Sequence, residues 1–176
     1  QADLDVLLAQ SSFYTGEVSI TNQAELDFIN TLGNKINVVQ GGVTITQTED
    51  MNVVTLTTVM SRFVTVTGDV TYSETVSSTV NPEFVNLIGT NSLTISHSGN
   101  ISLPKLAAVA GNLSIAGNSV DTQTVSLPAL TSIVGTQSFT GTAKATTFSM
   151  PALVETDGVI SIVIDRTGTV DLSAFS

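Results

Sequence analysis

The sequence predicts an all-β-rich solenoid, a single-domain stack of short parallel strands. A pentapeptide of the form Gly-x-(Val/Leu/Ile)-(Ser/Thr)-(Ile/Phe/Tyr) returns along the chain, at spacings from 20 residues (Asn91 to Gly111) to 27 residues (Gly41 to Gly68). Repeats of this length are typical of solenoids, in which each repeat buries its apolar face against its neighbours. Aromatic residues are only 5% of the 176 residues and hydrophobic residues 41%, which favours aliphatic side chains layered on strands. The copies are GEVSI from Gly16, GGVTI from Gly41, GDVTY from Gly68, NSLTI from Asn91, GNLSI from Gly111, GTQSF from Gly135 and GVISI from Gly158.

Each pentapeptide predicts a strand with one apolar face and one hydroxyl-bearing face. Side chains alternate between the two faces of a strand, so pairs such as Val18 and Ile20 should point inward. Gln137 interrupts this inward set, which predicts either a local register shift or a side chain bonded to a neighbouring backbone group. We expect the leading glycine to allow a turn with positive φ. The outward residues form a predicted exposed recognition stripe of Ser19, Thr44, Thr71, Thr94, Ser114 and Ser161.

A second apolar pattern precedes the later pentapeptides. It reads Val125-x-Leu127-x-x-Leu130-x-x-Ile133, and it recurs in the segments that begin at Ile101 and Phe148. The two-residue step predicts a strand, and the three-residue steps predict a tight turn or a single helical turn that returns the next apolar residue to the core. A proline follows the second apolar position in all three copies, where a strand must stop.

The start of the chain predicts a helical cap. Asn22-Gln-Ala-Glu25 has the capping-box pattern, and apolar residues follow at helical spacing before Gly33. A helix at about 22–32 would cover the open end of the stack and protect its first strand from edge pairing. We therefore expect a solenoid domain over residues 13–176, preceded by an N-terminal segment or linker over residues 1–12.

The far end of the chain predicts an incomplete repeat. Val170-x-Leu172-x-x-Phe175 copies the start of the second pattern, so the stack stops halfway through a unit. An under-capped end suits a truncated stack, a partner that completes it, or a loosely folded terminus. The possible assembly contacts are Leu7, Leu8, Val170, Leu172 and Phe175.

The motifs together resemble the irregular leucine-rich repeat proteins of the receptor L-domain type, as in surface proteins of Bacteroidetes-like bacteria and in fungal wall proteins. The resemblance rests on GEVSITNQAELDFIN near the start and on LPKLAAVAGNLSI from Leu103 to Ile115, and it covers nearly the whole chain. The asparagine ladder of ordinary leucine-rich repeats is irregular here, and the repeats near residues 46–90 are degenerate. The resemblance implies a secreted or surface-attached module for recognition, adhesion or structure, without catalysis.

Charge and composition exclude several classes of partner. Five Lys and Arg face fifteen Asp and Glu, a formal charge of −10, which repels nucleic acid and anionic membrane surfaces. The chain has no cysteine, so disulfides and thiolate sites are excluded. No apolar run approaches the roughly 20 residues that span a bilayer, so membrane insertion is not expected. The start at Gln1 suits a processed or excised fragment, and an extracellular or cell-surface location is expected.

No catalytic, cofactor or metal site is predicted, and the chain is not expected to be an enzyme. His97 is the only histidine, and without a Gly-x-Ser-x-Gly elbow or a partnered acid it is expected to be exposed and structural. No Asp-x-Asp-x-Asp calcium loop is present. The nearest acidic clusters, Glu49-Asp50 and Asp69 with Glu74, are predicted to be solvated loop residues.

Three functional hypotheses follow. The first is a non-catalytic recognition or adhesion module that binds a protein or glycan through the outward strand faces and loops. The alternative is a structural subunit of a filament, surface layer or virion, in which copies of the chain assemble through the ends of the stack. A solenoid enzyme would need clustered carboxylates or a basic residue on one face, and none is evident.

Thr-x-Thr pieces such as Thr44-Ile-Thr46 suggest ice binding, but the unequal repeat spacing argues against a regular array.

Overall fold

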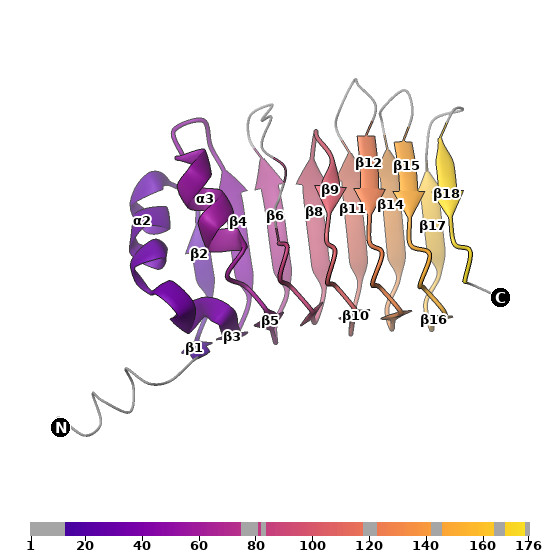
Figure 1. Ribbon diagram of the computed structural model, residues 1–176, viewed down its shortest axis with the longest axis horizontal. Helices are drawn as coiled ribbons and strands as arrows, with labels where there is room; N and C mark the ends of the chain where they lie inside the picture. The colour runs from indigo at the N-terminus through magenta and orange to yellow at the C-terminus, as the bar shows by residue number, and fades with distance from the viewer. Residues whose placement is uncertain are drawn as a thin grey trace.

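The structure, a computed structural model, describes residues 13–74, 81, 84–117, 123–141, 146–163 and 168–174. It is β-rich, with parallel strands in three stacked sheets and few helices, an arrangement compatible with a solenoid-like stack (Figure 1). The predicted β-rich stack of parallel strands is therefore confirmed at this level. Residues 1–12 lie outside the described residues.

We call the three sheets A, B and C. Sheet A contains β1 (Phe13–Thr15), β3 (Val38–Gln40), β5 (Thr65–Val66), β7 (Gly89–Thr90), β10 (Ala108–Val109), β13 (Ser132–Ile133) and β16 (Glu155–Thr156). Sheet B contains β2 (Val18–Ile20), β4 (Val43–Gln47), β6 (Val70–Glu74), β8 (Leu93–His97), β11 (Leu113–Gly117), β14 (Gln137–Gly141) and β17 (Ile160–Val163). Sheet C contains β9 (Ile101–Ser102), β12 (Gln123–Ser126), β15 (Thr146–Ser149) and β18 (Thr169–Asp171).

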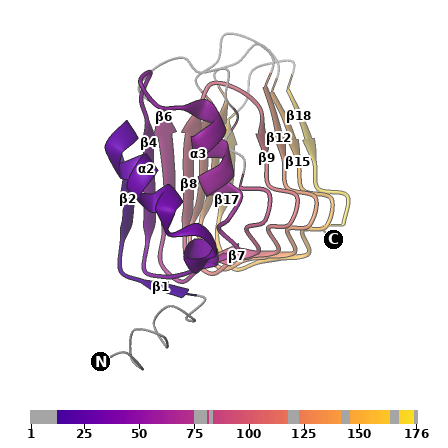
Figure 2. The ribbon, with the colours of Figure 1, turned by 60° about the vertical axis from the view of Figure 1, so that its left-hand side comes forward.

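The chain passes through the sheets in a fixed order. Each turn adds one strand to sheet A and the next strand to sheet B, and the later turns also add one strand to sheet C. In the first two turns the helices α2 (Gln23–Thr31) and α3 (Val53–Met60) follow the sheet B strand in place of a sheet C strand (Figure 2). The short 3-10 helix η1 (Gly33–Asn37) connects α2 to sheet A.

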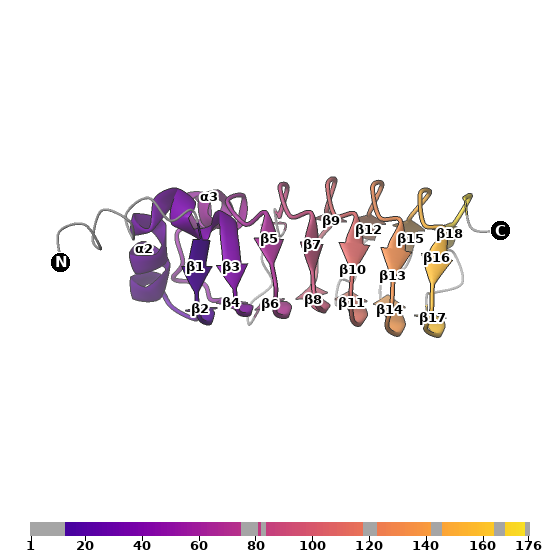
Figure 3. The same cartoon turned by 90° about the horizontal axis from the view of Figure 1, so that it is seen from below.

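Helix α2 lies where the capping box predicts a helix. The Asn22 side chain accepts a hydrogen bond from the Glu25 amide at 3.0 Å, and the Glu25 carboxylate accepts one from the Thr21 amide at 2.7 Å. The helix buries Leu26 and Ile29. It lies at the N-terminal end of the stack, beyond β1 and β2 (Figures 1 and 3), so one end of the core is covered.

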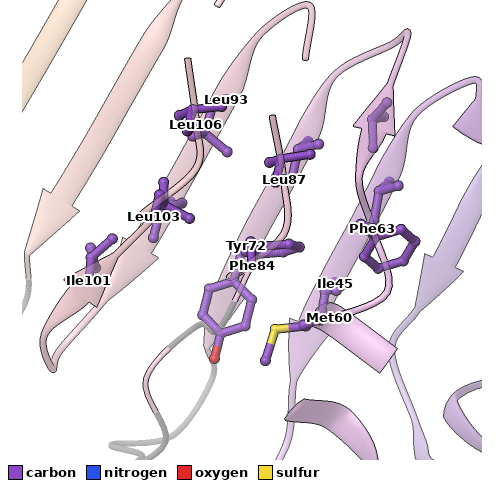
Figure 4. Packing of buried hydrophobic residues seen from close by; sticks show 14 of the residues in the cluster. Ile45, Met60, Phe63, Tyr72, Phe84, Leu87, Leu93, Ile101, Leu103 and Leu106 are labelled. Atoms are coloured by element: carbon purple, nitrogen blue, oxygen red, sulfur yellow. The ribbon is translucent and has the colours of Figure 1, made fainter. Parts of the chain in front are cut away.

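The inward side chains of the three sheets form one continuous core. The alternate positions of the pentapeptides from Val18 to Ile115 are at most 1% exposed, as predicted. The three-residue steps of the second pattern are tight turns, in which the Leu130 amide donates to the Leu127 carbonyl at 3.2 Å. Where the strands are degenerate, aromatic rings fill the core, and the ring centroids of Tyr72 and Phe84 lie 6.4 Å apart (Figure 4).

The leading glycines are required mainly by close approach between turns, which corrects the expectation of positive φ. Among the described copies only Gly16 and Gly41 have positive φ. At Gly68 an added Cβ would lie 2.6 Å from the Gly41 carbonyl oxygen, and at Gly135 it would lie 2.6 Å from the same atom of Gly111. The backbones of successive turns therefore touch at this corner, where a Cβ at Gly68 or Gly135 does not fit, whereas Asn91 holds the equivalent position in the fourth copy.

Candidate functional site

The outer face of sheet B carries the predicted recognition stripe. The stripe residues are adjacent partners in consecutive parallel pairings, and Ser138 on β14 joins them, so seven strands contribute one hydroxyl each. Ser19, Thr44 and Thr94 are exposed, as is Ser161, whereas Thr71 and Ser114 are half-buried. Neighbouring strands are separated by about 4.8 Å, so the hydroxyls form an ordered row. Sequence reasoning missed Ser138 because Gln137 interrupts the apolar pattern.

A second outward row lies two residues further along six of the seven sheet B strands, all except the short β2. The Thr46 and Ser73 hydroxyl oxygens lie 3.4 Å apart in this row. Neither row contains a charged residue, although the chain has a formal charge of −10. We call the two rows together the sheet B face. The second row consists of Thr46, Ser73, Ser96, Ala116, Thr140 and Val163.

Unequal repeat lengths do not disturb this face. The pairing register places Thr44 beside Thr71 and Thr71 beside Thr94 although the two steps in sequence differ in length. The expectation that unequal spacing spoils the regularity is therefore wrong for sheet B. The variation in length falls between the sheet B strands, and the strands themselves stay aligned.

His97 is buried, which corrects the expectation that it is exposed. It lies at the end of β8 with 0% exposure, and its Nδ1 lies 2.8 Å from Oε2 of Glu74 at the end of β6. The other carboxylate oxygen of Glu74 accepts a hydrogen bond from the Ser98 amide at 2.6 Å. Nε2 of His97 faces the Asn81 side-chain oxygen at 3.4 Å. Sequence reasoning missed this pair because Glu74 and His97 are far apart in the chain.

The environment of His97 favours its neutral form. Burial lowers the pKa of His97, and the nearby Glu74 carboxylate partly opposes this effect. The Tyr72 ring packs edge-on against the imidazole with centroids 5.9 Å apart. Burial, and then the charge of Glu74, raises the pKa of Tyr72 well above its usual range, and the Tyr72 hydroxyl donates to the Gln47 side chain. This group ties three neighbouring sheet B strands together at their ends.

The acidic clusters have different environments. Glu49 and Asp50 are exposed, in agreement with the predicted solvated loop. Glu74 is not solvated, because its side chain is only 5% exposed. Asp69 is exposed, but its carboxylate accepts hydrogen bonds from the Asn91 side chain at 2.7 Å and the Ser92 amide at 3.1 Å. Two of these four acids therefore bind neighbouring turns of the stack.

Of the two alternatives predicted for Gln137, a register shift or a side chain bonded to a neighbouring backbone group, the structure confirms the second. The register of sheet B continues through it, since it pairs with Leu113 and Ile160. Its side chain is buried and donates to the Gly135 carbonyl at 2.6 Å and to the Thr156 hydroxyl. Gln123 is also buried and donates to the carbonyls of His97 and Gly99. Both amides thus satisfy backbone groups at corners of the stack.

The predicted assembly contacts are only partly described. Val170 is 39% exposed on β18, and Leu172 is half-buried against the core. Leu7, Leu8 and Phe175 lie outside the described residues. Val170 and Leu172 are thus brought together at the C-terminal end of the stack.

Comparison with protein families, with curated proteins and with solved structures finds no match for this chain. Within the described residues, no group of three or more His, Cys, Asp or Glu is placed to hold a metal ion. The described helices are too short or too polar to cross a membrane. The pairing register of sheet B supplies the sheet B face as the candidate site.

Proposed function

We propose that the chain is a leucine-rich-repeat-like solenoid of the extracellular or cell-surface type, and that it is a non-catalytic recognition or adhesion module. The observation that carries this proposal is the sheet B face, with seven hydroxyls in register on one row. Serine and threonine hydroxyls both donate and accept hydrogen bonds. An extended surface of this kind suits a ligand that is itself long and regular.

The chemistry of the sheet B face favours a neutral glycan. The face has no charged residue to pair with an ionic ligand, and the acidic chain as a whole repels polyanions. A linear neutral polysaccharide offers repeated hydroxyls that match donors and acceptors on the face. Each contact is weak, so binding depends on many contacts along the ligand.

Co-sedimentation with insoluble polysaccharides tests this proposal. We expect the chain to pellet with at least one neutral polymer from a panel of cellulose, chitin and insoluble starch, and to be displaced by soluble oligosaccharides of that polymer. Binding should persist at high salt, because it does not depend on ion pairs. Sedimentation with none of these polymers would count against a glycan ligand.

The register of the sheet B face also favours ice as a second candidate ligand. Ice is an ordered array of water molecules, and hydroxyls held in fixed rows can match such an array. An assay of ice recrystallisation separates the two ligands, because a glycan-binding face need not slow crystal growth. Inhibition without polysaccharide binding would favour ice.

The alternative function, a structural subunit that assembles through its ends, is favoured by one observation. Val159 and Val163, beside and on β17, are 70% and 58% exposed, and large apolar side chains at the surface suit contact with a second copy. Light scattering over a wide concentration range tests this alternative. Filaments or closed oligomers would support it, and a monomer at all concentrations would count against it.

A further inference from the structure

The described cations of this acidic chain occupy one equivalent position in the turns that lead into sheet A. Backbone hydrogen bonds of 2.8 Å align these turns, and they join Asn37, Val64, Ile88 and Ala107 in succession. The residues two positions earlier are Lys35, Arg62, Asn86 and Lys105, which we call the basic row. The row contains every Lys and Arg that the structure describes.

The side chains of the basic row lie outside the core. Lys35 and Lys105 are exposed, and Arg62 is half-buried. The next residue in each turn points inward, as Figure 4 shows for Phe63, Leu87 and Leu106, which are all 0% exposed. The positive charges therefore follow one corner of the stack, from turn to turn.

Hydrogen bonds hold two of the three cations along this corner. Nζ of Lys105 donates to Oδ1 of Asn86 at 2.7 Å, and Nδ2 of Asn86 donates to the Ser61 carbonyl at 2.7 Å. Nη1 of Arg62 donates to the Asn30 carbonyl of α2 at 3.0 Å. This bond uses one of the five N–H donors of the guanidinium group. Each of these side chains thus reaches the preceding turn, and the positive groups form an ordered line.

No described carboxylate pairs with the basic row. Among the described residues the only ion pair joins His97 and Glu74, although the chain contains fifteen Asp and Glu against five Lys and Arg. Nζ of Lys35 has no hydrogen-bond partner within the described part of the chain. The row therefore keeps its positive charge available for an anionic group from another molecule.

An apolar strip runs beside the basic row. It consists of Val64, Ile88 and Ala107, and Ile88 is 47% exposed. A partner that covers the row and the strip together needs carboxylates and apolar side chains. A protein segment supplies both kinds of group, whereas an acidic polysaccharide lacks apolar side chains.

The charge of the whole chain limits the size of the anionic partner. A formal charge of −10 opposes a nucleic acid or an anionic membrane, because each brings many negative charges. A short acidic segment brings few, and at physiological ionic strength charges more than about 8 Å away are largely screened. Close pairs with Lys and Arg then decide whether the segment binds.

We propose that the basic row binds an acidic segment of a partner protein. Lys35, Arg62 and Lys105 face the carboxylates of the segment, and Ile88 contacts its apolar side chains. The guanidinium group of Arg62 suits a carboxylate in particular, because its geometry matches the two oxygens. The charge pairs supply selectivity, and burial of apolar surface adds affinity. The basic row is separate from the sheet B face, so each proposal can fail alone.

A labelled acidic peptide tests the proposal. The probe is a rhodamine-labelled peptide of Glu and Leu interspersed with Ser, and fluorescence anisotropy measures its binding to the full chain. We expect saturable binding that weakens as salt rises. Two control peptides carry Gln for Glu or Ser for Leu, and each should bind at least about fivefold more weakly. Absence of binding, or equal binding of either control peptide, would overturn the proposal.

A competing polymer tests the class of partner. Polygalacturonate carries carboxylates without apolar side chains. At the same concentration of carboxylate it should displace the labelled peptide poorly. Full displacement would overturn the assignment to a protein partner in favour of an acidic polysaccharide.

Matched charge variants locate the binding surface. Lys35→Gln with Lys105→Gln should weaken peptide binding at least about fivefold. Ser102→Glu with Thr124→Glu changes the net charge by the same amount at two exposed positions of sheet C, and it should change binding by less than about twofold. Thermal unfolding checks that both variants are folded. An equal loss in both variants, or no loss in the first, would overturn the assigned surface.

Discussion

At the scale of single residues, burial of a histidine links stability to pH. Burial lowers the pKa of His97 in the folded chain, whereas an unfolded histidine titrates near about 6.5. As the pH falls below that value, the unfolded chain therefore takes up a proton that the folded chain resists. The facing Glu74 carboxylate lowers the free-energy cost of protonating buried His97 without removing this cost. The packed Tyr72 ring stays neutral over this pH range.

We expect the free energy of unfolding to fall by up to about 1.4 kcal/mol for each pH unit below 6.5, until the pKa of folded His97 is reached. Urea denaturation at pH values of about 7.5, 6.5 and 5.5 measures this slope. His97 is the only histidine, so His97→Gln should remove most of the slope. A wild-type chain that becomes more stable on acidification would show that pairing with Glu74 outweighs burial.

The close approach of successive turns at the leading glycines gives a second prediction at the scale of single residues. Gly68→Ala would place a Cβ 2.6 Å from the Gly41 carbonyl oxygen and should destabilise the fold by about 1–3 kcal/mol. Gly89→Ala is the matched control, because its nearest atom would lie 3.7 Å away, and it should be nearly neutral. Chemical denaturation of both variants measures the difference, and equal stability would argue against close packing between turns.

At the scale of secondary-structure elements, α3 shows where local pattern misleads. Residues 53–60 read VVTLTTVM, and their β-branched residues favour a strand. The segment is helical because the Asn52 side chain accepts a hydrogen bond from the Thr55 amide at 3.0 Å, and because Leu56, Val59 and Met60 are buried on one face. Helix α2 was predictable because its capping box and apolar spacing agree.

The cap of α3 can be tested against its exposed surface. Asn52→Ala removes the capping oxygen and should destabilise the fold by about 1 kcal/mol. Val54 is 74% exposed, so Val54→Ala should be neutral or stabilising by about 0.5 kcal/mol through helix propensity. Thermal and urea unfolding measure both effects. A destabilisation by Val54→Ala equal to that by Asn52→Ala would contradict this account of the helix.

The strands of sheet B were predictable in position and in face. Alternation of apolar and hydroxyl residues places Val18 inward and Ser19 outward, and the structure agrees. Contacts between turns were less predictable, because the pairing of Glu74 with His97 depends on the register between strands. A local pattern reports periodicity within one strand, whereas register follows from the whole stack.

At the scale of the whole molecule, the two ends of the stack differ in cover and in charge. Helix α2 covers the N-terminal end, and the C-terminal turn leaves apolar side chains half-buried beside exposed acids. The long outer face of sheet B lies between these ends and carries no charge on its two rows. The proposed recognition face therefore lies along the side of the stack, between its two ends.

The most direct test of the account is whether charge placed on the sheet B face abolishes binding. Thr44→Lys with Thr94→Lys changes two exposed positions of the face, and Ser102→Lys with Thr124→Lys changes two exposed positions of sheet C by the same charge. Thermal unfolding first checks that both variants are as stable as the wild-type chain. Their affinities are then compared by sedimentation with the neutral polysaccharide that the wild-type chain binds. We expect at least about a tenfold loss of affinity for the first variant and wild-type affinity for the second. Equal affinity of both variants would rule out the sheet B face as the binding surface.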